Sequence, residues 1–284
     1  MLWILSCQQN ATFRQKAAAL RFYAEREEER LFEKKVNLLR CNRSRHLPSR
    51  KLAETCQKGT VLLSSRILQK EREKLVRAGV RVFCAQQSSP FRLWLALNCA
   101  LSLLEESGQP FPCQALGIID PNFCCTELIR HALLHLTQVR VLTQNLPAAQ
   151  RFAARMMDEY GAPLLYSDDE AVLPAQGLTF SPHGILPQRD LPLMLPFYVE
   201  TGERRAPIFD SPAPVLPQPL KQMLPEDIDG ALLMEALATS ERCSFLLGCR
   251  AQSVVQRTPT GPLCLCIGAA AGALSLEALE GKRG

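Results

Sequence analysis

Between residues 60 and 181 the chain alternates short apolar runs with amphipathic stretches, and this alternation limits its fold more than any other feature. The short runs are typical of buried strands, and the stretches between them space their apolar residues as one side of a helix does. Strands joined by helices pair in parallel and are covered on both faces. We therefore expect strands at 60–64, 80–84, 115–119, 139–143, 163–167 and 177–181.

The same pattern predicts a fold class. Right-handed crossovers between parallel strands build a doubly wound sheet, so the sequence predicts an α/β protein with a Rossmann-like core. Helix boundaries agree with this interpretation. Gly79, Gly108 and Gly161 each follow a predicted helix, where a left-handed residue ends it, and Ser89 with Pro90 begins another.

The segment before residue 60 has a different character. Residues 11–39 carry apolar side chains at helical spacing and a block of Glu and Arg at 25–30, which predicts a helix supported by charge pairs. Residues 40–51 are basic and irregular, as a loop or linker is.

We therefore predict four parts. They are a basic helical N-terminal segment at 1–58, a βαβ unit at 59–112, a Rossmann-like domain at 113–205, and a Pro-rich α/β segment at 206–284 that packs on the core. In the last part we expect a strand at 208–209, a helix at 229–240 and a strand at 263–267.

Charge is distributed unevenly. Residues 1–81 carry 19 Lys and Arg against 8 Asp and Glu, a net charge of +11, while the rest of the chain is net acidic. Such asymmetry is typical of a surface that meets nucleic acid or another acidic partner, although the basic stretch at 40–51 lacks interleaved aromatic residues. The apolar run at 91–104 is too short for a membrane span and predicts a buried helix, so we expect no membrane association. The sequence predicts no particular oligomeric state.

The chain has twelve cysteines, most of them inside apolar runs, and no C-x-x-C pair. Buried free thiols behave as small apolar groups, and the reducing cytosol keeps them free. We therefore expect a cytoplasmic protein without disulfides and, lacking the usual ligand spacing, without a metal site.

Residues 113–184 resemble the nucleotide-binding Rossmann domain of the shikimate dehydrogenase and glutamyl-tRNA reductase type. The resemblance lies in the order of segments: Ala-Leu-Gly-Ile-Ile-Asp at 115–120, Val-Arg-Val-Leu-Thr-Gln-Asn at 139–145, Pro-Leu-Leu-Tyr-Ser at 163–167, and Leu-Pro-Ala-Gln-Gly-Leu-Thr-Phe-Ser-Pro-His-Gly at 173–184. It implies NAD(P) binding and, for the preceding α/β segment, a substrate-holding domain.

The first turn departs from that family. A dinucleotide fold holds the pyrophosphate with G-x-G-x-x-G after its first strand, because glycine lets the backbone approach the phosphates. Here the turn reads Asp-Pro-Asn-Phe-Cys-Cys at 120–125. Asp120 brings a carboxylate to that place, and Pro121 removes a backbone donor. NAD(P) thus stays a cofactor implied by the resemblance, without the glycine motif that ordinarily holds it.

Polar residues at the predicted carboxyl ends of the strands form the candidate crevice, since open α/β sheets bind ligands at that edge. Helix capping and turn formation are the alternative roles for each of them. The candidate residues are Asp120, Asn122, Thr143, Asn145, Ser181, His183 and Gly184.

Two further patterns could indicate a metal site and a reactive thiol. Glu127, His131 and His135 share one helical face, as metal-binding histidines do, but that face lies opposite the apolar stripe and predicts solvent exposure. Cys124 and Cys125 open a helix, where a thiol pKa can fall, but Cys125 falls on the apolar side by helical phase and no base is assigned to it.

Three functions remain open at this stage. The first, which we favour, is a non-catalytic Rossmann-like protein that binds a small molecule or acts as a scaffold or regulator. The second is an NAD(P)-dependent oxidoreductase with an atypical cofactor loop. The third is a binder of nucleic acid or another acidic partner through residues 1–81. Fold analogy alone does not choose among them.

Overall fold

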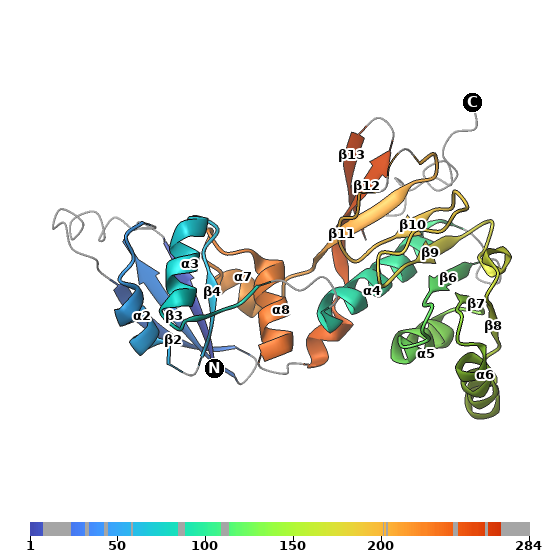
Figure 1. Cartoon of the computed structure of the whole chain (residues 1–284), viewed down its shortest axis with the longest axis horizontal. Helices are drawn as coiled ribbons and strands as arrows, with labels where there is room; N and C mark the ends of the chain where they lie inside the picture. The colour runs from blue at the N-terminus through green and yellow to red at the C-terminus, as the bar shows by residue number, and fades with distance from the viewer. Residues whose placement is uncertain are drawn as a thin grey trace. The chain divides into compact units, whose positions relative to one another are not determined.

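The computed structural model describes residues 1–7, 24–31, 34–42, 45–57, 59–84, 89–108, 114–200, 202, 204–240, 244–258 and 261–267. It is an α/β protein whose chain divides into two compact units (Figure 1). Unit 1 comprises residues Met1–Phe91 and Leu216–Leu247, and unit 2 comprises Arg92–Val215 and Gly248–Gly284. This division differs from the four parts predicted from the sequence.

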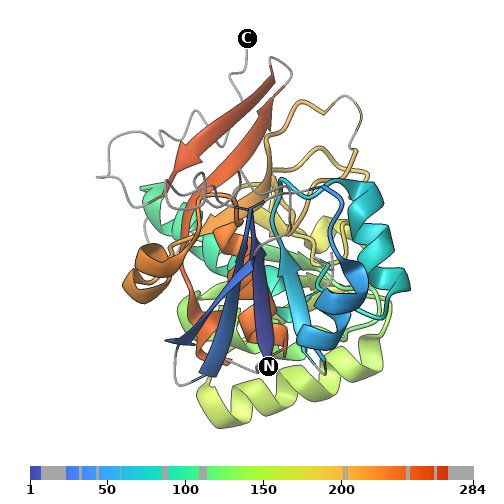
Figure 2. The same cartoon turned by 90° about the vertical axis from the view of Figure 1, so that its left-hand side faces the viewer.

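Unit 1 is built on a five-stranded sheet of order β2-β3-β1-β4-β5, in which only the edge strand β2 is antiparallel to its neighbour (Figure 2). The expectation of a helix through residues 11–39 is wrong where the structure describes them, and residues 11–23 lie outside the described part. Its strands are β1 (Leu2–Ser6), β2 (Ala24–Leu31), β3 (Lys34–Cys41), β4 (Thr60–Leu63) and β5 (Arg81–Val82).

Helices cover both faces of this sheet. The side chains of Trp3, Leu5 and Val61 pack with those of α2 (Ser49–Thr55) and α3 (Gln69–Arg77). The alternate residues Leu2, Ile4 and Leu62 are also fully buried and face the other side, because successive side chains of a strand point to opposite faces. On that side α8 (Gly230–Ser240), preceded by the short helix α7 (Gln218–Met223), contacts β1 and β4 (Figure 1).

A buried carboxylate joins the second segment of unit 1, residues Leu216–Leu247, to the first by hydrogen bonds. Asp227 is 3% exposed, and its two oxygens accept hydrogen bonds from Ser6 Oγ at 2.7 Å and from the Cys7 N–H at 2.6 Å. The N–H of Ser65, just after β4, donates to the Asp227 carbonyl at 3.0 Å. The segment before α8 thus closes the carboxyl ends of β1 and β4.

Unit 2 contains an eight-stranded sheet of order β13-β12-β11-β10-β9-β6-β7-β8, parallel from β11 to β8 and antiparallel at β12 and β13. Its strands are β6 (Ala115–Ile119), β7 (Gln138–Leu142), β8 (Leu164–Ser167), β9 (Leu178–Phe180), β10 (Leu193–Met194), β11 (Ile208–Pro214), β12 (Ala251–Thr258) and β13 (Gly261–Cys266). Its helices are α4 (Pro90–Glu106, within unit 2 from Arg92), α5 (Thr126–His135), α6 (Leu146–Tyr160) and the 3-10 turn η2 (Glu170–Val172); a second 3-10 turn, η3 (Ser244–Gly248), lies at the unit boundary.

In the sheet of unit 2 the order of successive strands reverses beside β6, and we call this place the switch point. From β6 the chain runs through α5 to β7 and through α6 to β8 on one side, and then β9 returns to pair with the other side of β6. Ligands of open α/β sheets bind at the carboxyl ends of the two strands that flank such a reversal. In unit 2 these strands are β6 and β9.

The helix predicted from the apolar run at 91–104 is confirmed as α4, and Leu97, Cys99, Ala100 and Leu104 on it are buried. Among the described residues, no helix combines the length and the apolar character needed to cross a membrane.

Replacing Asp227 with Ala should lower the free energy of unfolding of unit 1 by about 1–3 kcal/mol, because a buried N–H and a buried hydroxyl lose their acceptor. Urea unfolding followed by the fluorescence of Trp3, in a Trp94→Phe background, measures this. The exposed neighbour Glu226 offers the matched control, and Glu226→Ala should change stability by less than about 0.5 kcal/mol. Equal stability of the Asp227→Ala and parent proteins would contradict the role given to this carboxylate.

Candidate metal centre

The turn after β6 is organised by Asp120, whose side chain is fully buried. Its Oδ2 accepts a hydrogen bond from the Cys125 N–H at 2.7 Å, just before the first residue of α5. The carboxylate therefore satisfies a backbone donor that has no partner within the helix. Asp120 therefore has the helix-capping role that the sequence left open as an alternative, and the hydrogen bond from Cys125 uses one of its two carboxylate oxygens.

The same turn directs two thiols toward that carboxylate. Phe123 has a φ of 53°, and its ring packs edge-on against Phe152 at 5.6 Å between centroids. This left-handed residue bends the chain back so that Cys124 Sγ lies 3.4 Å from Asp120 Oδ1. Cys124 is exposed, and Cys125 is buried.

The loop after the neighbouring strand β9 contributes an imidazole. After β9, Ser181 Oγ donates to the carbonyl of Ile185 at 2.7 Å, and the Gly184 N–H donates to the carbonyl of Ser181 at 3.2 Å. Gly184 has a φ of 70°, and a Cβ on it would come within 3.0 Å of a Val199 methyl. Glycine at this position therefore keeps the turn tight, and the turn presents His183.

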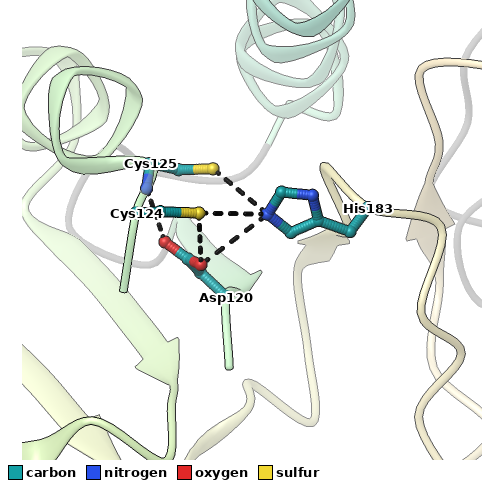
Figure 3. A group of neighbouring side chains, drawn as sticks. All are labelled: Asp120, Cys124, Cys125 and His183. Atoms are coloured by element: carbon teal, nitrogen blue, oxygen red, sulfur yellow. Dashed lines mark hydrogen bonds and ion pairs between the residues drawn. The ribbon is translucent and has the colours of Figure 1, made fainter. Parts of the chain in front are cut away.

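These four side chains converge at the switch point (Figure 3). His183 Nε2 lies 3.4 Å from Cys124 Sγ, 3.6 Å from Cys125 Sγ and 3.7 Å from Asp120 Oδ1. One ligand atom from each residue lies within 4.8 Å of all the others. No second group of three or more such ligands comes together in the part of the chain that the structure describes.

The separations match those of a tetrahedral zinc site. With Zn–S near 2.3 Å and Zn–N and Zn–O near 2.0–2.1 Å, a tetrahedral ion separates sulfur from nitrogen by about 3.6 Å and nitrogen from oxygen by about 3.4 Å. The sulfur to nitrogen distances around His183 agree with this, and the oxygen of Asp120 lies slightly farther out. The separations of His183 Nε2 from the other three donors are thus close to those around a tetrahedral ion.

The electrostatics of the metal-free cluster keep its thiols protonated. Burial, followed by the charge of Asp120, raises the pKa of both Cys124 and Cys125 above the ordinary thiol value. A bound metal ion reverses this preference, because only the thiolate is a ligand and the proton is released on binding.

The other predicted crevice residues serve the structure around the cluster. Thr143 Oγ1 donates to the carbonyl of Pro121 at 3.1 Å, and Asn145 Nδ2 donates to the carbonyl of Asn122 at 3.3 Å. Asn145 Oδ1 also accepts from the Ala148 N–H at the start of α6. These contacts tie the turn after β7 to the turn after β6. Of the predicted residues, Asp120 and His183 therefore enter the cluster, and Ser181 and Gly184 shape the loop of His183.

The histidine pair on α5 does not form such a centre. The ring centroids of His131 and His135 are 4.5 Å apart with an edge-to-face arrangement, and Trp94 packs edge-on against His131 at 4.9 Å. Glu127 pairs with Arg130 on the same helix. His131 is half-buried, and burial lowers its pKa.

A hollow of about 490 Å³ lies in unit 1. Its wall includes Gly59 just before β4 and Arg81 at the start of β5, so it opens at the amino-terminal ends of parallel strands. Ligands of open α/β sheets bind at the opposite edge. We therefore take the convergent donors of unit 2, rather than this hollow, as the candidate site.

Part of the basic charge of the N-terminal third is paired within the sheet. Arg40 pairs with Glu27 at 3.0 Å, and Lys35 with Glu28 at 3.0 Å, across β2 and β3. The interaction of residues 1–81 with an acidic partner stays a prediction.

The sequence matches no protein-family model, and no curated protein matches it. The assignment of the site therefore depends on its geometry and chemistry.

In metal-free protein, Asp120→Ala should speed hydrogen exchange of the peptide that covers the start of α5, because the Cys125 N–H loses its acceptor. Loss of a helix-capping group costs about 1–2 kcal/mol of local stability. His183→Ala should leave that exchange unchanged, since the imidazole contacts the sulfur atoms of Cys124 and Cys125, whereas the Cys125 N–H donates to Asp120. Equal protection in all three proteins, measured by mass spectrometry in the presence of a chelator, would contradict the capping role.

Proposed function

We propose that this protein binds a zinc ion at the switch point of unit 2, through Asp120, Cys124, Cys125 and His183. The observation that carries the proposal is the convergence of two thiols, an imidazole and a carboxylate from two separate strand ends at tetrahedral spacing. Cys125 and His183 are 58 residues apart in the sequence, and the pairing of β6 with β9 brings them together.

The donor set selects among metals. Calcium and magnesium prefer oxygen ligands, and copper(II) favours a tetragonal arrangement, whereas thiolate and imidazole in a tetrahedron are typical of zinc. Asp120 and Cys125 are buried, so the ion would be held against the protein interior on one side. The Asp120 carboxylate would receive an outer hydrogen bond from the Cys125 N–H, which fixes its orientation as outer partners of metal ligands do.

The location links the metal to ligand binding. The turn that carries Asp120 is the one that holds a pyrophosphate in dinucleotide-binding Rossmann domains. A carboxylate and two thiolates there repel phosphate, so the metal takes the place of a nucleotide. We infer that the protein is a metal-dependent ligand-binding protein on a degenerate Rossmann-like core, and not an NAD(P)-dependent oxidoreductase.

Metal analysis of untagged protein tests this proposal. We expect one zinc per chain after purification without chelator. Cys124→Ser, Cys125→Ser and His183→Gln should each weaken zinc binding by more than about 100-fold, because even the loss of an outer partner costs about 10–100-fold. Affinity is measured by competition with a chromophoric chelator.

Matched controls come from the same unit. Cys264→Ser removes an exposed thiol of β13, and His135→Gln removes an exposed imidazole of α5, and both should retain full zinc content. Sub-stoichiometric zinc that is insensitive to the three ligand variants would refute the proposal.

A thermal-shift titration separates the metal site from the dinucleotide site. Zinc added to metal-free protein should raise the melting temperature, since binding to the native state at 100 times Kd adds about 2.7 kcal/mol of stability. NAD, NADH, NADP and NADPH should have no effect on either form. A dose-dependent rise with one of these cofactors would instead support the oxidoreductase alternative.

A further inference from the structure

The four donors of the cluster are not equivalent. Cys124 and Cys125 lie at the separation from His183 Nε2 that a shared tetrahedral ion requires, while Asp120 Oδ1 lies at 3.7 Å, outside it. Two thiolates and one imidazole are also the stronger ligands for zinc. The carboxylate oxygen is therefore the weakest ligand of the set and the donor farthest from His183 Nε2, while it lies 3.4 Å from Cys124 Sγ.

Asp120 can leave the metal without losing its position. Its Oδ2 is held by the Cys125 N–H at 2.7 Å, a bond that does not depend on the ion. The side chain is fully buried, so once detached it would stay beside the metal and would need a new hydrogen-bond donor for Oδ1. A protic group bound to the metal supplies that donor.

Solvent reaches the cluster at Cys124 and His183. Cys124 is exposed and the His183 side chain is 33% exposed, whereas Asp120 and Cys125 are buried. Figure 3 shows the imidazole facing the thiols and the carboxylate from the neighbouring loop. An incoming ligand would approach past Cys124 and His183, the two exposed members of the cluster.

On this basis, and resting on the proposed zinc site, we propose that the fourth coordination position is exchangeable and accepts a protic ligand: a water, hydroxyl or thiol group. In the exchange the metal–Oδ1 bond breaks, a bond forms from the metal to the oxygen or sulfur of the ligand, and the ligand proton is donated to Asp120 Oδ1. Three protein ligands with one open position distinguish zinc sites that act on substrates from closed structural sites.

Cobalt substitution tests the exchange, because Co²⁺ takes the same ligands and its visible and near-ultraviolet spectrum reports coordination. The cobalt-loaded full-length protein is titrated with 2-mercaptoethanol, and bound cobalt is measured in parallel. We expect a saturable shift of the visible bands and a rise of roughly one half in the thiolate charge-transfer absorbance, as a third thiolate joins two. Cobalt should remain at one per chain.

Asp120→Asn provides the second measurement, since the amide oxygen still accepts from the Cys125 N–H but is a poorer ligand. This variant should load cobalt and show, before any thiol is added, a spectrum different from that of the parent. His135→Gln should behave as the parent does in every titration.

The outcomes separate the two proposals. Thiolate bands that do not respond to mercaptoethanol in the parent protein, whether or not Asp120→Asn responds, would overturn the exchangeable position and leave a closed zinc site standing. Absence of any thiolate band in cobalt-treated protein would overturn the zinc site itself and the exchange with it.

Discussion

The candidate site depends on the pairing of β6 with β9, two strands that are far apart in the sequence. Their register places Leu116 opposite Leu178 and Ile118 opposite Phe180, so both strands end at the same edge. Gly177, with a φ of 128°, makes this pairing fit, because a Cβ there would lie 2.4 Å from the Ala115 carbonyl oxygen. The turn after β6 and the loop after β9 therefore face each other, and the distances from His183 to Asp120, Cys124 and Cys125 follow from this contact.

Much of unit 2 could be predicted because its signals are local. The strands and helices from β6 to β9 have apolar runs of the right length and glycine or proline at their ends, as at Gly161, which adopts the left-handed conformation at the end of α6. The helix predicted over 11–39 failed because the charged block at 25–30 suits two structures. Glu and Arg pair four residues apart on a helix, but here they lie on β2 and pair across it, as Glu27 does with Arg40.

The site was only half predictable for a related reason. Asp120 and His183 follow strands, so the sequence alone places them at the carboxyl edge. Cys125 is buried, as its predicted place on the apolar side implies, but its approach to His183 was not predicted, because the chain before α5 is not helical: Phe123 has a positive φ and Cys125 has a ψ of 36°. The thiols therefore turn toward the carboxylate. Two adjacent cysteines after one strand and a histidine after another strand follow none of the sequence spacings by which zinc sites are recognised.

Both units contain a buried aspartate that accepts a hydrogen bond from a cysteine N–H, but Asp120 directly follows β6, whereas Asp227 lies in the segment before α8. Asp227 accepts from the N–H of Cys7 as Asp120 accepts from that of Cys125. Beside Cys7, the thiol of Cys41 lies 3.3 Å away and donates to the Ser6 carbonyl; hydrogen bonding to Cys41, and then burial, raise the pKa of Cys7. Among the described residues, these groups do not form a cluster of three ligand atoms, unlike Asp120, Cys124, Cys125 and His183. A buried aspartate that accepts from a cysteine N–H therefore does not by itself gather candidate metal ligands; in unit 2 the turn at Phe123 and the loop of His183 bring two thiols and an imidazole to the same carboxylate.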